Sequence, residues 1–129
     1  MTDAPVRVLV VDDLALNLKL LSAILTANHF AVDTATSAEA ALDILATTSY
    51  ELVLLDLRLP GMDGLSLARQ LRADPAHQRA VLVAVTANAM KSDQAAALDA
   101  GCDAFVTKPI NTRTLIPTLH DLLARRKPS

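Results

Sequence analysis

Several residue types are scarce in this sequence of 129 residues. It contains one cysteine and no tryptophan, and its aromatic residues are Phe30, Tyr50 and Phe105. A lone cysteine, Cys102, excludes an intramolecular disulfide framework and indicates a reducing compartment, in which we expect the thiol to be a small buried core residue. Because aromatic side chains are so few, the core must be built from leucine, valine, isoleucine and alanine.

The sequence also lacks a strong charge of either sign and any long apolar run. Its formal net charge of -2 gives no electrostatic basis for nucleic-acid binding. The basic cluster at 125–127 is interpreted as a solvated helix end, where cations complement the helix dipole. No apolar run approaches the roughly 20 residues that cross a bilayer, and residues 1–5 do not resemble a signal peptide. We therefore expect a cytoplasmic protein that inserts into no membrane.

What the sequence does have is a regular alternation of two apolar patterns. Its length fits a single domain over residues 1–129, with a core from about 6 to 124 and flexible ends at 1–5 and 127–129. Valine- and leucine-rich runs, typical of strands buried on both faces, alternate with segments of helical spacing. Strands are expected at 6–11, 30–35, 52–55, 80–85 and 104–107. Helices are expected around 14–25, 38–45, 65–71, 90–100 and 115–122.

Individual residues mark the ends of these helices. Ser37 is placed to cap the second helix and Gly101 to end the fourth. Asn28 can take the left-handed conformation, so a tight turn before the second strand is feasible. Pro117 is awkward inside the last helix, because it removes a backbone donor and favours a kink.

Polar residues follow four of the five expected strands. These residues are Asp12 and Asp13, Asp56, Thr86, and Thr107 with Lys108. Five strands alternating with five helices indicate an α/β fold with a parallel sheet, whose ligand site lies beyond the carboxyl ends of the strands. Clustered carboxylates repel one another, and a divalent cation such as Mg²⁺ relieves that repulsion. A carboxylate can also form an aspartyl phosphate, which a metal, an ammonium and a hydroxyl would stabilise.

Each of these residues has a plainer interpretation when it is taken alone. Asp13 before a helix is a common N-cap, and Asp56 before a loop is a common turn residue. Thr86 would serve at a strand end, and Lys108 would be a surface cation. Their joint arrival at successive strand ends is what favours a phosphorylation site.

The chain resembles the receiver domains of two-component response regulators over about residues 6–123. The segments that carry the resemblance are VLVVDD (8–13), LVLLDLRLPGMDG (52–64), VAVTAN (83–88) and AFVTKPI (104–110). DDLALN (12–17) and TANAMKSD (86–93) are similar to receivers of hybrid histidine kinases and to single-domain regulators. The resemblance implies a flavodoxin-like, doubly wound fold, with a five-stranded parallel sheet in the order 2-1-3-4-5 and five helices.

The resemblance also implies a role for each residue that matches the family's motifs. Asp56 matches the phosphoacceptor. The metal, Mg²⁺ or alternatively Mn²⁺, would be held by Asp13, Asp56 and the backbone carbonyl of Arg58, with Asp12 acting through water. Thr86 and Lys108 match the residues that bind the phosphoryl oxygens, small Ala87 leaves access to that group, Phe105 falls at the aromatic switch position, and Pro109 falls where a cis peptide bond is common.

We therefore expect a phosphoacceptor domain that receives its phosphoryl group from a histidine kinase or a histidine phosphotransfer protein and then switches a surface for a downstream partner. It would assist only its own phosphorylation and dephosphorylation, and it would not be a turnover enzyme. An alternative is a phosphorylation-independent binding module, which the complete residue set disfavours. A second alternative is an aspartate-nucleophile phosphohydrolase, but Arg58 stands where such sites usually have a second acid.

Overall fold

The expected strands form one parallel sheet in the order β2-β1-β3-β4-β5. The computed structural model describes residues 5–59, 61, 63–87, 91–108 and 110–125. The strands are β1 (Arg7–Val11), β2 (Ala31–Ala35), β3 (Leu52–Asp56), β4 (Val81–Thr86) and β5 (Ala104–Thr107). The helices are α1 (Ala15–Ala27), α2 (Ala38–Leu45), α3 (Gly64–Ala73), α4 (Lys91–Asp99) and α5 (Thr112–Arg125). The predicted fold class and strand order are thus confirmed.

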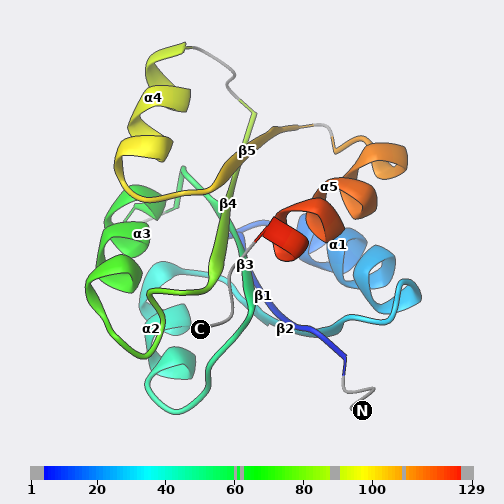
Figure 1. The fold of residues 1–129 in the computed structure, drawn as a ribbon, viewed down its shortest axis with the longest axis horizontal. Coiled ribbons are helices and arrows are strands. Elements are labelled where there is room, and N and C mark those ends of the chain that lie inside the picture. The colour runs from blue at the N-terminus through cyan, green and yellow to red at the C-terminus, as the bar shows by residue number, and fades with distance from the viewer. Residues whose placement is uncertain (1–4, 60, 62, 88–90, 109, 126–129) are drawn as a thin grey trace.

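Helices cover both faces of the sheet, with α1 and α5 on one side and α2, α3 and α4 on the other (Figure 1). Successive residues of β1 face opposite sides, so that Leu9 and Val11 join one buried cluster while Val8 and Val10 join the other. The central strands must therefore be apolar on both faces, which explains the unbroken valine and leucine runs. Among the described residues, no helix is long and apolar enough to cross a membrane.

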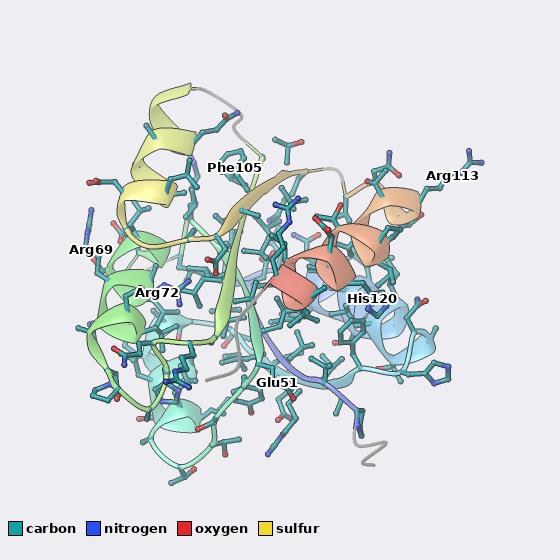
Figure 2. The ribbon with its side chains drawn as sticks, viewed as in Figure 1. Glu51, Arg69, Arg72, Phe105, Arg113 and His120 are labelled. Atoms are coloured by element: carbon teal, nitrogen blue, oxygen red, sulfur yellow. The ribbon has the colours of Figure 1, made fainter. Side chains whose placement is uncertain are left out.

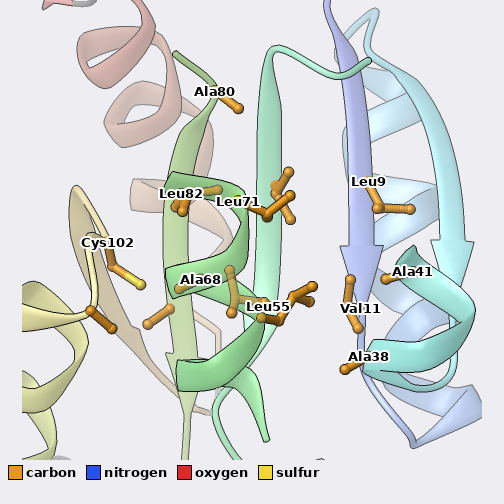
Figure 3. Packing of buried hydrophobic residues seen from close by; sticks show 14 of the residues in the cluster. Leu9, Val11, Ala38, Ala41, Leu55, Ala68, Leu71, Ala80, Leu82 and Cys102 are labelled. Carbon is orange, nitrogen blue, oxygen red and sulfur yellow. The ribbon is translucent and has the colours of Figure 1, made fainter. Parts of the chain in front are cut away.

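Small side chains bring α2 and α3 close to the sheet. Ala38, Ala41 and Ala68 are fully buried against leucines of the central strands (Figure 3). Cys102 joins the same cluster at 5% exposure, as predicted, and burial raises the pKa of its thiol to about 11. The cluster thus contains a cysteine that serves as a packing residue.

The end of α1 differs from the prediction by one residue. The left-handed conformation belongs to His29, at φ 70°, and not to Asn28, at φ -108°. The His29 N–H donates to the Thr26 carbonyl at 3.1 Å, and the Phe30 N–H donates to the Leu25 carbonyl at 3.0 Å. This pair of bonds is a Schellman motif, which places the left-handed residue directly before the apolar residue that packs back on the helix. Because Phe30 is that buried residue, His29 must take the strained position.

The other predicted helix ends agree with the structure. The Ser37 hydroxyl accepts the Ala40 N–H at 3.0 Å, and Gly101 has a φ of 108° after the end of α4. Pro117 lies inside α5, which continues past it to Arg125.

Arg72 has a structural role near the amino-terminal ends of β4 and β5 that no sequence pattern predicts. Its guanidinium donates to the carbonyl oxygens of Gly101 at 2.7 Å, Gln78 at 2.8 Å and Ala80 at 2.6 Å. It also pairs with the Asp103 carboxylate at 2.6 Å, and Figure 2 shows it lying between α3 and β4. One side chain of α3 therefore ties together the segments that enter β4 and β5.

Candidate functional site

The carboxyl ends of four neighbouring strands bring the expected polar residues together. Asp12 directly follows β1, Asp56 ends β3 and Thr86 ends β4, and these strands are adjacent in the sheet. Their exposed fractions are 1%, 6% and 1%. Burial of polar groups at this level costs free energy unless they have hydrogen-bond or charge partners.

Lys108 bridges the two buried carboxylates. Its Nζ donates to Asp56 Oδ2 at 2.9 Å and to Asp12 Oδ2 at 3.0 Å. Burial lowers the pKa of the Lys108 ammonium, but its hydrogen bonds and charge interactions with Asp56 and Asp12 outweigh this effect and raise the pKa above the ordinary lysine value. The ammonium therefore remains charged at neutral pH, as a partner of two carboxylates and not as a solvated surface cation.

The loop after β3 fixes the second oxygen of Asp56. The Arg58 N–H donates to Asp56 Oδ1 at 2.9 Å, while the side chain of Arg58 is exposed. Gly64, the first residue of α3, packs so closely that a Cβ atom there would collide with the carbonyl oxygen of Asp56 and lie 2.9 Å from the Cα of Leu57. Only a glycine lets α3 begin this close to the acid.

Asp13 does not have the structural role that its position before a helix suggested. The N-cap of α1 is Leu14, which has no side-chain cap, and its N–H donates to Asp12 Oδ1 at 3.0 Å. Asp13 is exposed at the rim of the site. One carboxylate oxygen from each of Asp12, Asp13 and Asp56 lies within 4.8 Å of the others. A group of hard oxygen donors at this spacing fits Mg²⁺.

Three more of the predicted residues lie on β4 and β5 or directly after them. Ala87 is exposed beside buried Thr86, and the Thr86 carbonyl accepts the Lys108 N–H at 2.8 Å. Phe105 pairs in register with Ala84 and packs, half-buried, on the α4 side of β5 (Figure 2). Pro109 lies outside the described residues.

Asn17 also belongs to the site, although the positions of the strand ends did not predict it. Its Nδ2 donates to Asp12 Oδ2 at 3.2 Å, so this oxygen accepts from both Asn17 and Lys108. The DDLALN segment offered a signal, because a polar residue there interrupts the apolar spacing of α1.

Residues 8–120 match the family described as the response regulator receiver domain. The chain belongs to this family. The receiver domain is 38% identical to the response regulator PleD of Caulobacter vibrioides over 116 residues, which are 90% of this chain and 26% of PleD. It is 32% identical to the polar-differentiation response regulator DivK of Brucella anthropi over 119 residues, which are 92% of this chain and 97% of DivK. The receiver domain thus spans about a quarter of the first relative and nearly all of the second.

Solved structures share the fold of this receiver domain. One is the receiver domain of a sensor histidine kinase from Pseudomonas aeruginosa, with a TM-score of 0.86 and 29% identity, covering 94% of this chain and 99% of that one. That structure has a magnesium ion coordinated in its active-site cleft. The comparisons place this receiver domain in two-component signalling.

Proposed function

We propose that this receiver domain accepts a phosphoryl group on Asp56 from the phosphohistidine of a histidine kinase or a histidine phosphotransfer protein. The observation that supports this most is the Lys108 ammonium, 2.9 Å from a buried Asp56 carboxylate that lies beside two further acids. A structural ion pair would not need three converging carboxylates at the ends of parallel strands. An acceptor for an anionic group needs such a centre, together with cations that neutralise the incoming charge.

The transfer exchanges one bond to phosphorus for another. A carboxylate oxygen of Asp56 bonds to phosphorus while the phosphorus–nitrogen bond of the phosphohistidine breaks, and the electron pair of that bond stays with the imidazole nitrogen. Lys108 pairs with a phosphoryl oxygen, which replaces one of its carboxylate partners. The hydroxyl of Thr86, at the end of β4, donates to a second phosphoryl oxygen, and exposed Ala87 leaves space for the group.

Asp13, Asp56 and the backbone carbonyl of Arg58 would hold Mg²⁺, or alternatively Mn²⁺, with Asp12 acting through water. The bound cation supplies charge neutralisation for the carboxylates and the phosphoryl oxygens. The magnesium-containing receiver of the Pseudomonas kinase supports this assignment, as does the spacing of the three carboxylates in this chain.

The proposed output is a change in the surface around α4 and β5. Thr86 pairs with Thr107 in the register of β4 and β5, and Phe105 lies two residues before Thr107 on β5. Movement of Thr86 toward the phosphoryl group would therefore vacate space near Phe105. Phe105 would then turn inward and shift the populations of two surface states, one of which binds the downstream partner.

The direct test is magnesium-dependent labelling with acetyl phosphate, followed by mass spectrometry. Asp56→Asn should abolish the added phosphoryl mass. Asp63→Asn is the matched control, because Asp63 lies in the same loop and caps α3 by accepting the Ser66 N–H at 2.8 Å, and asparagine is an equally good cap. Labelling that persists unchanged in Asp56→Asn would overturn the proposal.

We also propose that the domain is not a turnover phosphatase. Arg58 stands two residues after Asp56, where an aspartate-nucleophile phosphohydrolase usually has a second acid, and its contact with Asp56 is made by its backbone N–H. Incubation with p-nitrophenyl phosphate should release less than one equivalent of product per chain. Release of many equivalents would support the phosphohydrolase alternative.

A further inference from the structure

Asn17 is the third residue of α1, and its side chain reaches back to the phosphorylation site. Side chains on a helix tilt toward its N-terminus, which carries the carboxamide over the start of α1 to Asp12. The distance from Asn17 Nδ2 to Asp12 Oδ2 is 3.2 Å, and Asn17 is half-buried. Because the acceptor is a carboxylate oxygen, the contacting group must be the amide NH₂.

Asp12 depends on three donors in this structure. Its Oδ1 accepts the Leu14 N–H at 3.0 Å, and its Oδ2 accepts Lys108 Nζ at 3.0 Å and Asn17 Nδ2 at 3.2 Å. Only the Lys108 donor is shared with Asp56. A phosphoryl group on Asp56 would attract the Lys108 ammonium, so this donor is the one that Asp12 stands to lose during the reaction.

We propose that Asn17 is a positioning residue that keeps the Asp12 carboxylate oriented for the metal, both before transfer and after Lys108 turns to the phosphoryl group. This inference rests on the proposed function. Once Lys108 has moved, Asn17 is the side-chain donor that still opposes rotation of the buried carboxylate. Loss of a hydrogen-bond partner behind a metal-binding group typically weakens metal affinity by about 10- to 100-fold.

Asn28 provides a matched control on the same helix. Its Nδ2 donates to the Ile24 carbonyl at 2.8 Å at the opposite end of α1, away from the acids. Asn28→Ala therefore removes an asparagine hydrogen bond from α1 without touching Asp12. If Asn17 acted only by supporting the helix, Asn17→Ala and Asn28→Ala would have similar effects.

The first measurement is a titration of the unphosphorylated protein with Mn²⁺, followed by the electron paramagnetic resonance signal of free Mn²⁺. We expect Asn17→Ala to raise the dissociation constant about 10-fold or more. Asn17→Leu, which fills the same space without a donor, should behave like Asn17→Ala, Asn17→Gln should recover part of the affinity, and Asn28→Ala should match the parent. An unchanged or lower dissociation constant in both Asn17→Ala and Asn17→Leu would overturn the inference.

The second measurement is the Mg²⁺ dependence of labelling by acetyl phosphate. Asn17→Ala should need about 10-fold more Mg²⁺ for half-maximal labelling and should approach the parent rate at saturation. A lower rate at saturation with the same half-maximal concentration would contradict the positioning role. Because the Mn²⁺ titration needs no phosphorylation, a parent that binds Mn²⁺ but is never labelled would refute the proposed function while the titration still decides the role of Asn17.

Discussion

Replacing His29 by glycine should stabilise the receiver domain, although histidine is the native residue. His29 is exposed and holds a φ of 70° at the end of α1. A left-handed conformation costs a residue with a Cβ atom roughly 1–2 kcal/mol, and glycine avoids this cost but loses roughly 0.5–1 kcal/mol more chain entropy on folding. The net gain should be about 0.5–1 kcal/mol.

Urea denaturation measures this gain, and the neighbouring residue provides the control. With a denaturant dependence of roughly 1–3 kcal/mol per molar, His29→Gly should raise the midpoint by about 0.2–1 M. Asn28→Gly should lower it, because Asn28 has a φ of -108° and would lose its side-chain bond to Ile24. A midpoint that falls in His29→Gly, or rises more in Asn28→Gly, would refute the account of the Schellman motif.

Four further predictions concern three other residues. Lys108→Met should slow acetyl phosphate labelling by about 100-fold or more, since it removes a fixed positive charge from the developing phosphoryl group; a rate within threefold of the parent would contradict this role. Because the folded pKa of Lys108 lies above the ordinary 10.5, the stability that its charge provides is fully present below that pH and is lost as the pH rises through the folded pKa. The difference in unfolding free energy between the parent and Lys108→Met should therefore be constant from pH 7 to about 9 and decline above about 10.5. A decline that begins near neutral pH would exclude the charge of Lys108 as the source of this stability. Gly64→Ala should destabilise the domain by about 1–3 kcal/mol in urea, because its Cβ meets the backbone of Asp56 and Leu57; a smaller cost together with normal labelling would show that the loop adapts. Arg72→Met should lower the unfolding free energy by about 2–5 kcal/mol, since it removes the donor of backbone carbonyls and the ion pair with Asp103. Arg69→Met, an exposed change on the same helix, should cost less than about 0.5 kcal/mol.

The fold and the main site were predictable because both depend on patterns along the chain. Alternation of apolar strands and amphipathic helices fixes a doubly wound sheet, and the sheet in turn brings together whatever follows its strands. The strand order therefore makes Asp12, Asp56 and Thr86 neighbours, and the sequence alone predicts their approach. The position of the main site is thus predictable from the sequence.

Contacts that depend on a particular three-dimensional approach were not predictable. Asn28 and His29 are adjacent, and which of them takes the positive φ depends on which apolar residue packs back on the end of the helix. Arg72 donates to backbone carbonyls, which every residue possesses, so no residue type in the sequence reveals its partners. Asn17 sits within an apolar helix pattern, and only the turn of the helix over Asp12 gives it a partner.

The state of Cys102 has a practical consequence for spectroscopy. At 5% exposure, and with burial raising its pKa to about 11, the thiol holds almost no reactive thiolate at neutral pH. Maleimide or nitroxide reagents should therefore not react with Cys102, and the native chain can serve as an unreactive background. A single cysteine introduced at an exposed position such as Gln94 or Thr114 would then carry a spin label or fluorophore alone, and the motion of α4 or α5 on phosphorylation could be followed without altering the core.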